Sequence, residues 1–310
     1  MTALHVRSTH APNAERHGVL AGQWLASLTS ENTTKAYRRD LAGYFSFLDA
    51  HDLDALDARR EHVDLFRHSL TGASSTVARK LSAVSSFYSY AGSAGRVTAN
   101  PAALVKRPKV ASDAGSTPGM TDQQAQALLD AARADSARSY ALVSVLLFTG
   151  ARLSEALGAN FSDLRHDAGH RLLTVTRKGG TRAPLPLPPQ VVNALGSYLG
   201  ASVAQGSEIT ITDAASAHAP IFRTATGKRW ASSEAFRTIQ RLARLSGIEG
   251  EISPHSLRVT HITMALAHGA PIHEVQDSVG HKDPRTTQRY NRGRNRLERS
   301  SAYTVASVLS

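Results

Sequence analysis

Hydrophobic positions in the first hundred residues recur at spacings of three and four, the pattern of helices with one buried face. The clearest example starts after Ser30 or Asn32 and lines up five apolar side chains, namely Tyr37, Leu41, Tyr44, Phe45 and Leu48. The same spacing predicts helices near residues 22–28, 60–70 and 75–91. Because no alternating strand pattern interrupts residues 18–105, we expect this region to be a small all-helical domain.

A second set of helices is expected after residue 120. Thr121, followed three residues later by Gln124, is a capping-box signal for a helix start. Residues 140–148 read YALVSVLLF and are apolar nearly all round, which predicts a helix at the centre of a core that ends at Gly150. A later helix over residues 232–245, capped by Ser232 or Ser233, is expected to bury Phe236, Ile239 and Leu242.

One β-hairpin is expected between these helices. Residues 171–176 and 182–187 read as strands on either side of a turn that contains two glycines. Pro184 and Pro186 cannot donate backbone hydrogen bonds, so the second strand is expected at a sheet edge. Short strands are also possible at residues 208–212 and 220–222. The predicted fold class is therefore mainly α with a small β-hairpin or sheet (α+β).

The segment 106–120 reads KRPKVASDAGSTPGM, and its prolines, glycines and serines are typical of a linker. Residues 1–17 are polar and unpatterned, which predicts a flexible N-terminal arm. We therefore expect an arm at 1–17, a helical domain at 18–105, a linker at 106–120 and a larger mixed domain at 121–310.

The balance of charge points to nucleic acid. Lys and Arg number 36 against 25 acidic residues, which gives a net charge of +11 and an isoelectric point near 10.2. There is no cysteine, so disulfides and thiolate metal sites are excluded. No apolar run resembles a secretory signal or reaches the ~20 residues of a membrane span, so a cytoplasmic protein is expected.

The stretch from Pro254 to Tyr290 concentrates polar groups suited to anion chemistry. It carries His255, Arg258, His281 and Tyr290 within what reads as a short helix hairpin, with stops at Gly269 and Gly280. Asp283 and Pro284 then read as the start of a further short helix that carries Tyr290. Two histidines, an arginine and a tyrosine indicate a site that binds an anion and attacks it with a phenol.

A DNA phosphodiester fits this set of groups. Its non-bridging oxygens gain charge in the transition state, and arginine supplies fixed charge with several donors. Arg258 and the earlier Arg152 both lie near predicted helix starts, where backbone N–H groups favour anions. Tyr290 offers a phenol for a covalent phosphoester, and Lys178 at the hairpin tip is placed to protonate a leaving oxygen. Each residue alone has an ordinary structural interpretation, such as an Arg152–Glu155 ion pair; the ordered set is what favours function.

The ordered set resembles the tyrosine recombinase (phage integrase) family. Its first arginine box is similar to residues 149–155, TGARLSE, which contain Arg152 and the supporting Glu155. Lys178 is similar to the hairpin lysine of the family, and His255 with Arg258 is similar to its His-x-x-Arg box. His281 is similar to the histidine of its Gly-His element, and Tyr290, nine residues later, to its nucleophile. The resemblance covers about residues 18–295, and it identifies 18–105 with the helical DNA core-binding domain and 121–310 with the catalytic domain.

The resemblance implies a mechanism and partners. Tyr290 would form a 3′-phosphotyrosyl link, Arg152 and Arg258 would hold the phosphate, His255 and His281 would assist, and Lys178 would protonate the 5′-oxygen. No metal or other cofactor is needed. The partner would be a double-stranded DNA recombination site. The enzyme would act as a homo-tetramer, or a hetero-tetramer with a related recombinase, in which a C-terminal element (here residues 301–309) packs on a neighbour.

Basic side chains on the first domain are candidates for DNA contact. They lie on two predicted helices and comprise Lys35, Arg38, Arg39, Arg79 and Lys80. For any single one of them, an ordinary solvated surface residue is the simpler interpretation.

Two alternatives remain open at the level of sequence. A type IB topoisomerase-like enzyme shares the arginines, lysine, histidine and tyrosine, but relaxes one duplex without a partner site. A non-catalytic DNA-binding relative would need phosphate contacts and no nucleophile. The target DNA sequence, the choice among integration, excision and dimer resolution, and any partner recombinase cannot be read from the helices.

Overall fold

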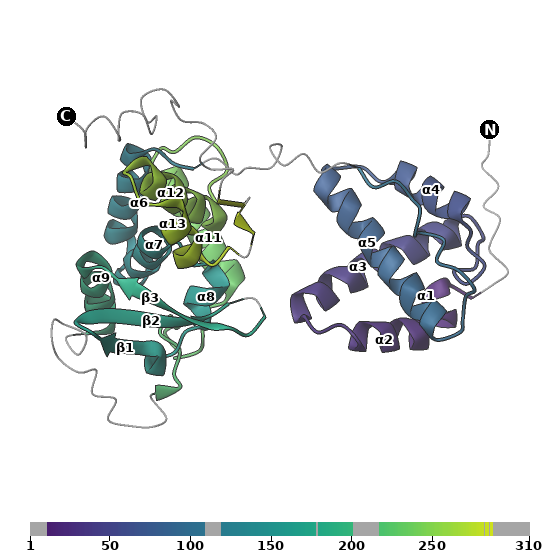
Figure 1. Cartoon of the computed structure of the whole chain (residues 1–310), viewed down its shortest axis with the longest axis horizontal. Helices are drawn as coiled ribbons and strands as arrows, with labels where there is room; N and C mark the ends of the chain where they lie inside the picture. The colour runs from purple at the N-terminus through teal and green to yellow at the C-terminus, as the bar shows by residue number, and fades with distance from the viewer. Residues whose placement is uncertain are drawn as a thin grey trace, which may run out of the picture. The chain divides into compact units, whose positions relative to one another are not determined.

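The computed structural model describes residues 11–108, 119–177, 179–200, 217–281, 283–284 and 286–287 (Figure 1). Its internal contacts divide the chain into two compact units, Met1–Ser116 and Thr117–Ser310. Each unit has a hydrophobic core of its own. Within the described residues, no helix combines the length and the apolar character that crossing a membrane would need.

The described part of the first unit is a bundle of five helices. They are α1 Asn13–Arg16, α2 Gly18–Ala26, α3 Glu31–Ala50, α4 Arg60–Ser69 and α5 Ser74–Ser93. Ser30 caps α3 by accepting a hydrogen bond from the backbone of Thr33, and the stripe predicted on this helix faces the core. The core is aromatic: Trp24 contacts both Tyr37 and Phe87, and Trp24 is only 1% exposed.

Two buried tyrosines tie three segments of this bundle together. The hydroxyl of Tyr88 donates to the carbonyl of Ala55 at 2.7 Å, and the hydroxyl of Tyr44 lies 3.0 Å from that of Tyr88. Burial raises the pKa of Tyr44 to about 12. Both phenols are therefore neutral, and their hydroxyl groups make hydrogen bonds within the bundle.

The range predicted as an N-terminal arm includes an ordered helix. Asn13, at the start of α1, is fully buried, and its side chain donates to the carbonyl of Leu53 and accepts from the backbone of Ala55. His17 pairs with Asp54 at 2.9 Å. Polar side chains of an unpatterned segment thus fasten it to the loop after α3, which hydrophobic periodicity does not reveal.

The second unit is built around α7 Ala137–Thr149, which is buried on nearly every side, as predicted. It contacts α6 Asp122–Asp135, α9 Pro189–Leu199 and α12 Pro254–Ala267. The other helices among the residues described are α8 Leu153–Gly158, the 3-10 turn η1 Phe161–Asp163, α11 Ser232–Leu245 and α13 Ile272–Val279. Trp230 lies in this core at 3% exposure, under the guanidinium of Arg138, whose Cζ is 4.1 Å from the ring centroid.

A three-stranded antiparallel sheet covers one side of this core (Figure 1). Its strands, in spatial order, are β1 Leu164–Asp167, β2 His170–Thr176 and β3 Arg182–Leu187. The hairpin of β2 and β3 was predicted, and β3 is an edge strand as its prolines require. Strand β1 was not predicted; it joins β2 through a tight turn in which Ala168 and Gly169 have φ of 46° and 83°.

Three details of the predicted helices and strands differ from the structure. Helix α11 has Ala231 at its N-cap position, so Ser232 begins the helix instead of capping it. Phe236 was predicted to be buried, but 37% of it is exposed, whereas Ile239 and Leu242 are buried. Residues 220–222 form no strand; Pro220 makes an isolated bridge with Asn160. The predicted strand at 208–212 and the tail at 301–309 lie outside the described residues.

Candidate active site

The first arginine stands at the turn between α7 and α8. Gly150 ends α7 in the left-handed conformation with φ 65°, and Arg152 precedes the first residue of α8. Glu155 accepts from the backbone of Arg152 at 2.9 Å and from its Nη1 at 2.6 Å. Glu155 is buried, with 5% exposed, while 38% of the Arg152 side chain reaches solvent. The carboxylate therefore orients the arginine, and the arginine presents the exposed part of its charge outward.

The second arginine lies inside the unit. Arg258, on α12, donates from Nη1 to the carbonyl of Gly150 and from Nη2 to the carbonyl of Val279, both at 2.5 Å. Only 2% of Arg258 is exposed. Its guanidinium thus joins the turn after α7 to the end of α13.

His261 supports the same junction from one turn further along α12. Its Nδ1 lies 3.1 Å from the carbonyl oxygen of Leu147, near the end of α7. A Cβ at Gly150 would lie 2.6 Å from Cδ2 of His261, so the ring packs directly on the glycine. Burial lowers the pKa of His261, which keeps the ring neutral at pH 7.

Helix α13 delivers His281. Gly280 ends the helix with φ 66°, and the backbone of His281 donates to the carbonyl of Gln276 at 3.1 Å. Nδ1 of His281 and the hydroxyl of the buried Thr287 form a hydrogen bond of 2.9 Å. That bond engages one ring nitrogen and leaves Nε2 as the other polar atom of the ring.

The two histidines share one electrostatic environment. Desolvation, together with the charges of Arg258 and Arg152, lowers the pKa of His255, whose side chain is exposed at the surface. The same three causes, in the same order, lower the pKa of His281 to about 4. Both rings are therefore neutral at pH 7, so each can accept a proton or share a hydrogen bond.

A further arginine, Arg177, reaches this cluster from the hairpin. It donates from Nη1 to the carbonyl of Asp277 at 3.2 Å and from Nη2 to that of Ser278 at 2.7 Å. Sequence reasoning passed over both Arg177 and Thr287. The signal for Arg177 was its place beside Lys178 in the hairpin turn, and Thr287 left no signal because its role depends on a tertiary contact.

The structure brings together five of the predicted site residues, namely Arg152, Glu155, His255, Arg258 and His281. Lys178 and Tyr290 lie outside the described residues. The described residues nearest to them in the chain are Arg177 and Gly179 on either side of the lysine, and Thr287, three positions before the tyrosine.

Comparison with known proteins identifies this arrangement. A family model described as "Phage integrase family" matches residues 119–296, which is more than half of the chain, and "Phage integrase, N-terminal SAM-like domain" matches residues 23–95. The chain belongs to the phage integrase family. The two matched ranges fall in the two compact units, one in each.

Similar curated proteins carry the name tyrosine recombinase. Tyrosine recombinase XerC of Rhodospirillum centenum is 35% identical over 87% of this chain and 80% of that protein. Tyrosine recombinase XerD of Mycobacterium leprae is 32% identical over 91% of this chain and 93% of that protein. This member of the phage integrase family is thus an enzyme that cleaves and rejoins DNA.

Solved structures share the fold. XerH site-specific recombinase bound to palindromic difH substrate, in a post-cleavage complex, matches with a TM-score of 0.70 and 14% identity over 96% of this chain and 98% of that chain. A lambda integrase (75–356) dimer bound to a COC′ core site matches with a TM-score of 0.68 and 16% identity over 90% and 96%. At these identities the likeness establishes the fold alone.

The DNA-contact candidates on the first unit differ in their surroundings. Arg79 forms an ion pair with Asp40, whose side chain is 2% exposed, and this pair links α5 to α3. Lys35 pairs with Glu31 at 2.5 Å on the surface, while Arg38 and Arg39 are exposed and Lys80 is partly buried. Arg79 keeps 41% of its side chain exposed, so it stays a DNA-contact prediction. It also has a structural role, because removing it would leave a buried carboxylate unpaired.

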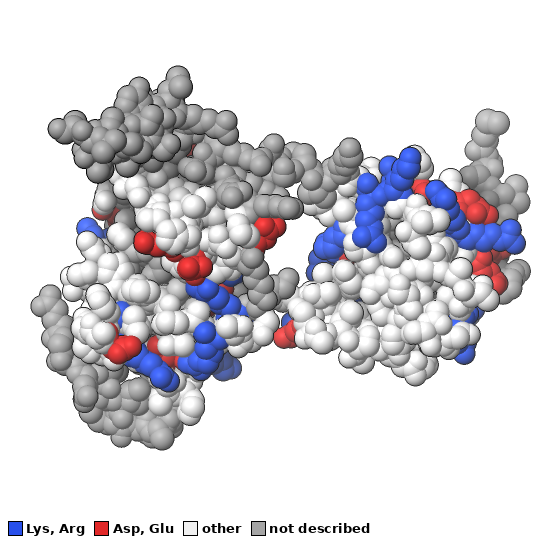
Figure 2. All heavy atoms as spheres, viewed as in Figure 1, with Lys and Arg blue, Asp and Glu red and all other residues white. Residues whose placement is uncertain are grey.

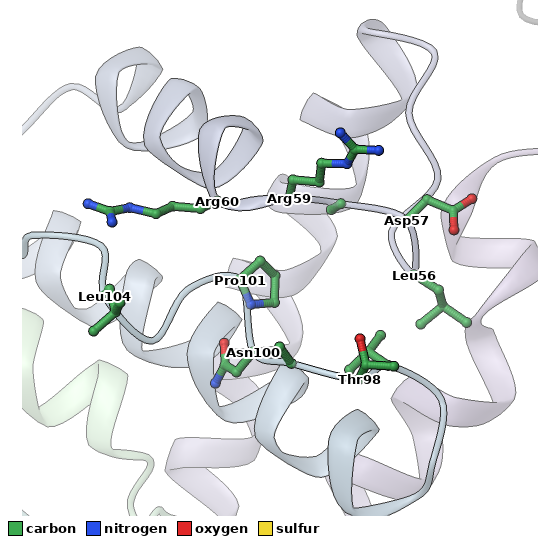
Figure 3. Close-up of a pocket in the computed structure, with 11 residues that line it drawn as sticks. Leu56, Asp57, Arg59, Arg60, Thr98, Asn100, Pro101 and Leu104 are labelled. Carbon is green, nitrogen blue, oxygen red and sulfur yellow. The ribbon is translucent and has the colours of Figure 1, made fainter.

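Charge on the visible face gathers in two places. Lys and Arg side chains collect over α4 of the first unit and over the three-stranded sheet of the second (Figure 2). A cavity of about 420 Å³ lies in the first unit before α4, where Arg59 and Arg60 extend in different directions above Asn100 and Pro101 (Figure 3). This cavity holds none of the predicted site residues, and the described residues contain no cluster of His, Asp and Glu suited to a metal.

Proposed function

We propose that this protein is a site-specific DNA recombinase that works through a 3′-phosphotyrosyl intermediate at Tyr290. One observation carries the proposal. Two arginines and two histidines from three separate segments converge, and the charges of Arg152 and Arg258 lower the pKa of both His255 and His281. Such a concentration of positive charge and neutral imidazole suits a phosphodiester anion.

The proposed cleavage step is as follows. The Tyr290 oxygen bonds to the scissile phosphorus, and the bond from phosphorus to the 5′-oxygen breaks. The phenol proton passes to a neutral histidine, His255 or His281, and the 5′-oxygen takes a proton from Lys178. Arg152 and Arg258 stabilise the charge on the non-bridging oxygens.

The second step reverses the first with a different strand. A free 5′-hydroxyl from a partner duplex bonds to the same phosphorus, and its proton passes to the amine that Lys178 became in the first step. The bond to Tyr290 breaks, and the phenol oxygen takes back the proton held by the histidine. One phosphodiester bond is thus exchanged for another, and no nucleotide triphosphate is required.

We propose a double-stranded DNA recombination site as the partner, bound by four protomers in the cytoplasm. Support comes from a similar solved structure, a lambda integrase tetramer bound to a Holliday junction, with a TM-score of 0.69 and 15% identity. The four protomers are either copies of this chain or pairs with a related recombinase, and sizing the complex with this chain alone distinguishes the two. Integration, excision and dimer resolution share the same chemistry.

Helix α11 adds candidate DNA contacts that sequence reasoning missed. Its outer face lines a groove of about 540 Å³ with Arg237, Gln240 and Arg244. Arg241 on the same face is held by Asp135 at 2.7 Å. An exposed basic helix face of this kind is suited to phosphate contacts.

The test is the capture of a covalent adduct. Sheared and nicked chromosomal DNA of the organism that carries the gene is incubated with the protein, and denaturation-resistant protein–DNA products are isolated and sequenced. We expect an adduct joined to a 3′-phosphate at one recurring sequence with wild type and with the control Tyr140→Phe, and none with Tyr290→Phe.

Two results would contradict this function. An adduct that persists in Tyr290→Phe would show that Tyr290 is not the nucleophile. The absence of any adduct with wild type would support a non-catalytic DNA-binding protein. Adducts at many unrelated sequences, together with relaxation of an arbitrary supercoiled plasmid, would favour the topoisomerase-like alternative.

A further inference from the structure

The guanidinium of Arg177 leaves its own hairpin and binds the end of a helix. Both of its described hydrogen bonds go to carbonyls in the last turn of α13, those of Asp277 and Ser278. A Cβ at Gly280 would lie 2.1 Å from Nη1 of Arg177, so the bare glycine backbone is what admits the guanidinium. The contact therefore needs both Arg177 and Gly280.

The end of α13 is a favourable place for an arginine. The last carbonyls of a helix lack partners within the helix, and they carry the negative end of its dipole. The next carbonyl along, that of Val279, accepts from Arg258. Three successive carbonyls, the last of them two residues before His281, thus hold two arginines, one from the hairpin and one from α12.

The backbone of Arg177 also closes the hairpin turn. Its N–H donates to the carbonyl of Thr181 at 2.8 Å, and its carbonyl accepts from the N–H of Gly180 at 3.0 Å. Lys178 is the next residue in the chain. A lysine side chain is long and flexible, so the position of its backbone sets the volume that its ammonium can search.

We propose that Arg177 is a positioning residue: it fixes the hairpin turn to the end of α13, and the next residue in the chain, Lys178, depends on that anchor when it delivers its proton. In this role it acts through Lys178 and not on the phosphate itself. The proposal rests on the function proposed above, because it assigns Arg177 to the delivery of the proton that the leaving 5′-oxygen needs.

The leaving group distinguishes this role from a merely structural one. When the bond from phosphorus to the 5′-oxygen breaks, the electron pair stays on oxygen, and a proton must reach it. If sulfur replaces that oxygen, the bond from phosphorus to sulfur breaks and a thiolate leaves, which at a thiol pKa of about 8.5 needs little help. Poor delivery of the proton therefore lowers the rate of adduct formation with the oxygen substrate and leaves the rate with the sulfur substrate nearly unchanged.

The experiment uses the nicked duplex recovered from the adduct assay, made with either oxygen or sulfur at the 5′-bridging position. Single-turnover rates of adduct formation are measured for wild type, Arg177→Ala, Arg177→Lys and Lys178→Ala. Arg182→Ala is the matched control, because it removes the same charge from the same hairpin at a residue that pairs with Asp163. Thermal melting shows which variants fold.

We expect Arg177→Ala to lower the oxygen rate by about 10- to 100-fold, part of what general acid catalysis supplies, and the sulfur rate by less than about threefold. Arg177→Lys keeps the charge but cannot bind two carbonyls at once as the guanidinium does, so its oxygen rate is expected to lie between those of wild type and Arg177→Ala. Arg182→Ala is expected to show no sulfur-specific rescue.

Equal losses on both substrates in folded Arg177→Ala and Arg177→Lys would overturn the proposal, and so would rescue by sulfur in Lys178→Ala without rescue in Arg177→Ala. Failure of the underlying function looks different: wild type would form no adduct with either substrate.

Discussion

Arg152 and Glu155 show how one carboxylate can support an anion site without occupying it. Glu155 is almost fully buried, and it binds the arginine at both the backbone and the side chain. A buried charge without a partner is costly, so the pair holds Arg152 in one orientation. The exposed part of the guanidinium then faces solvent already positioned, which is what transition-state stabilisation requires.

We expect Arg152→Ala to lower the rate of adduct formation by about 100-fold or more, because it removes a fixed donor to the transition state. DNA affinity should fall little, since many other basic groups contact the backbone. Gel-shift and adduct assays on one duplex measure both quantities. Arg133→Ala, which removes a surface charge on α6, is the control. Parallel losses of binding and adduct would mean that Arg152 acts structurally.

The site residues that the sequence revealed are those within short motifs. Arg152 with Glu155, and His255 with Arg258, are neighbours along single helices, so spacing alone brings them to one place. The contacts of Arg177 and Thr287 cross between elements that are distant or irregular, and no local pattern encodes them.

At the scale of elements, the turn after α7 joins the two arginine boxes. Gly150 ends the helix with positive φ, its carbonyl receives Arg258, and the ring of His261 packs against its Cα. One residue therefore connects α7, α8 and α12. A side chain at this point would meet both an unfavourable backbone conformation and a closely packed ring.

We expect Gly150→Ala to destabilise the second unit by about 2–4 kcal/mol, the sum of positive-φ strain and overpacking. Gly158→Ala is the matched control, because it lies in neighbouring α8 and nothing approaches within 4 Å of its Cβ position. Urea unfolding measures both variants. Similar stabilities for the two would show that the contact at Gly150 relaxes freely.

Elements with strong local signals were predictable, and elements held by tertiary contacts were not. The Thr121–Gln124 capping box and the stop at Gly150 formed as expected. Strand β1 is only four residues long and mostly exposed, so it shows no clear alternation. Phe236 falls on the helical face that periodicity assigns to the core, yet packing leaves it partly exposed.

At the scale of the whole molecule, the pKa shifts predict that the two units respond differently to acid. In the second unit, the pKa values of His255, His261 and His281 are lowered from 6.5. Below about pH 6.5 the unfolded chain binds protons at these rings and the folded chain does not, so stability falls as pH falls. In the first unit, the described groups with a lowered pKa are Glu31 and Asp54, with ordinary values of 4.5 and 3.8, which lose stability only at lower pH.

We therefore expect the melting temperature of the second unit to be lower at pH 5 than at pH 7, while the melting temperature of the first unit stays nearly constant. Allowing for the partial exposure of two of the rings, the loss is about 1 kcal/mol, or about 2–4 °C. Calorimetry at several pH values measures it. His281→Gln should reduce the loss, and His51→Gln, an exposed histidine of the first unit, should not. Equal shifts in both units would refute the assignment.

The chain has two tryptophans, one in each core: Trp24 among the aromatic rings of the first unit, and Trp230 beneath Arg138 in the second. Each indole is a natural fluorophore in a dry setting, and exposure to water shifts its emission to longer wavelength. In Trp24→Phe the tryptophan fluorescence comes from the second unit alone, and in Trp230→Phe it comes from the first unit alone. Each half of the molecule can thus be followed separately, without an added dye, while it folds or meets DNA.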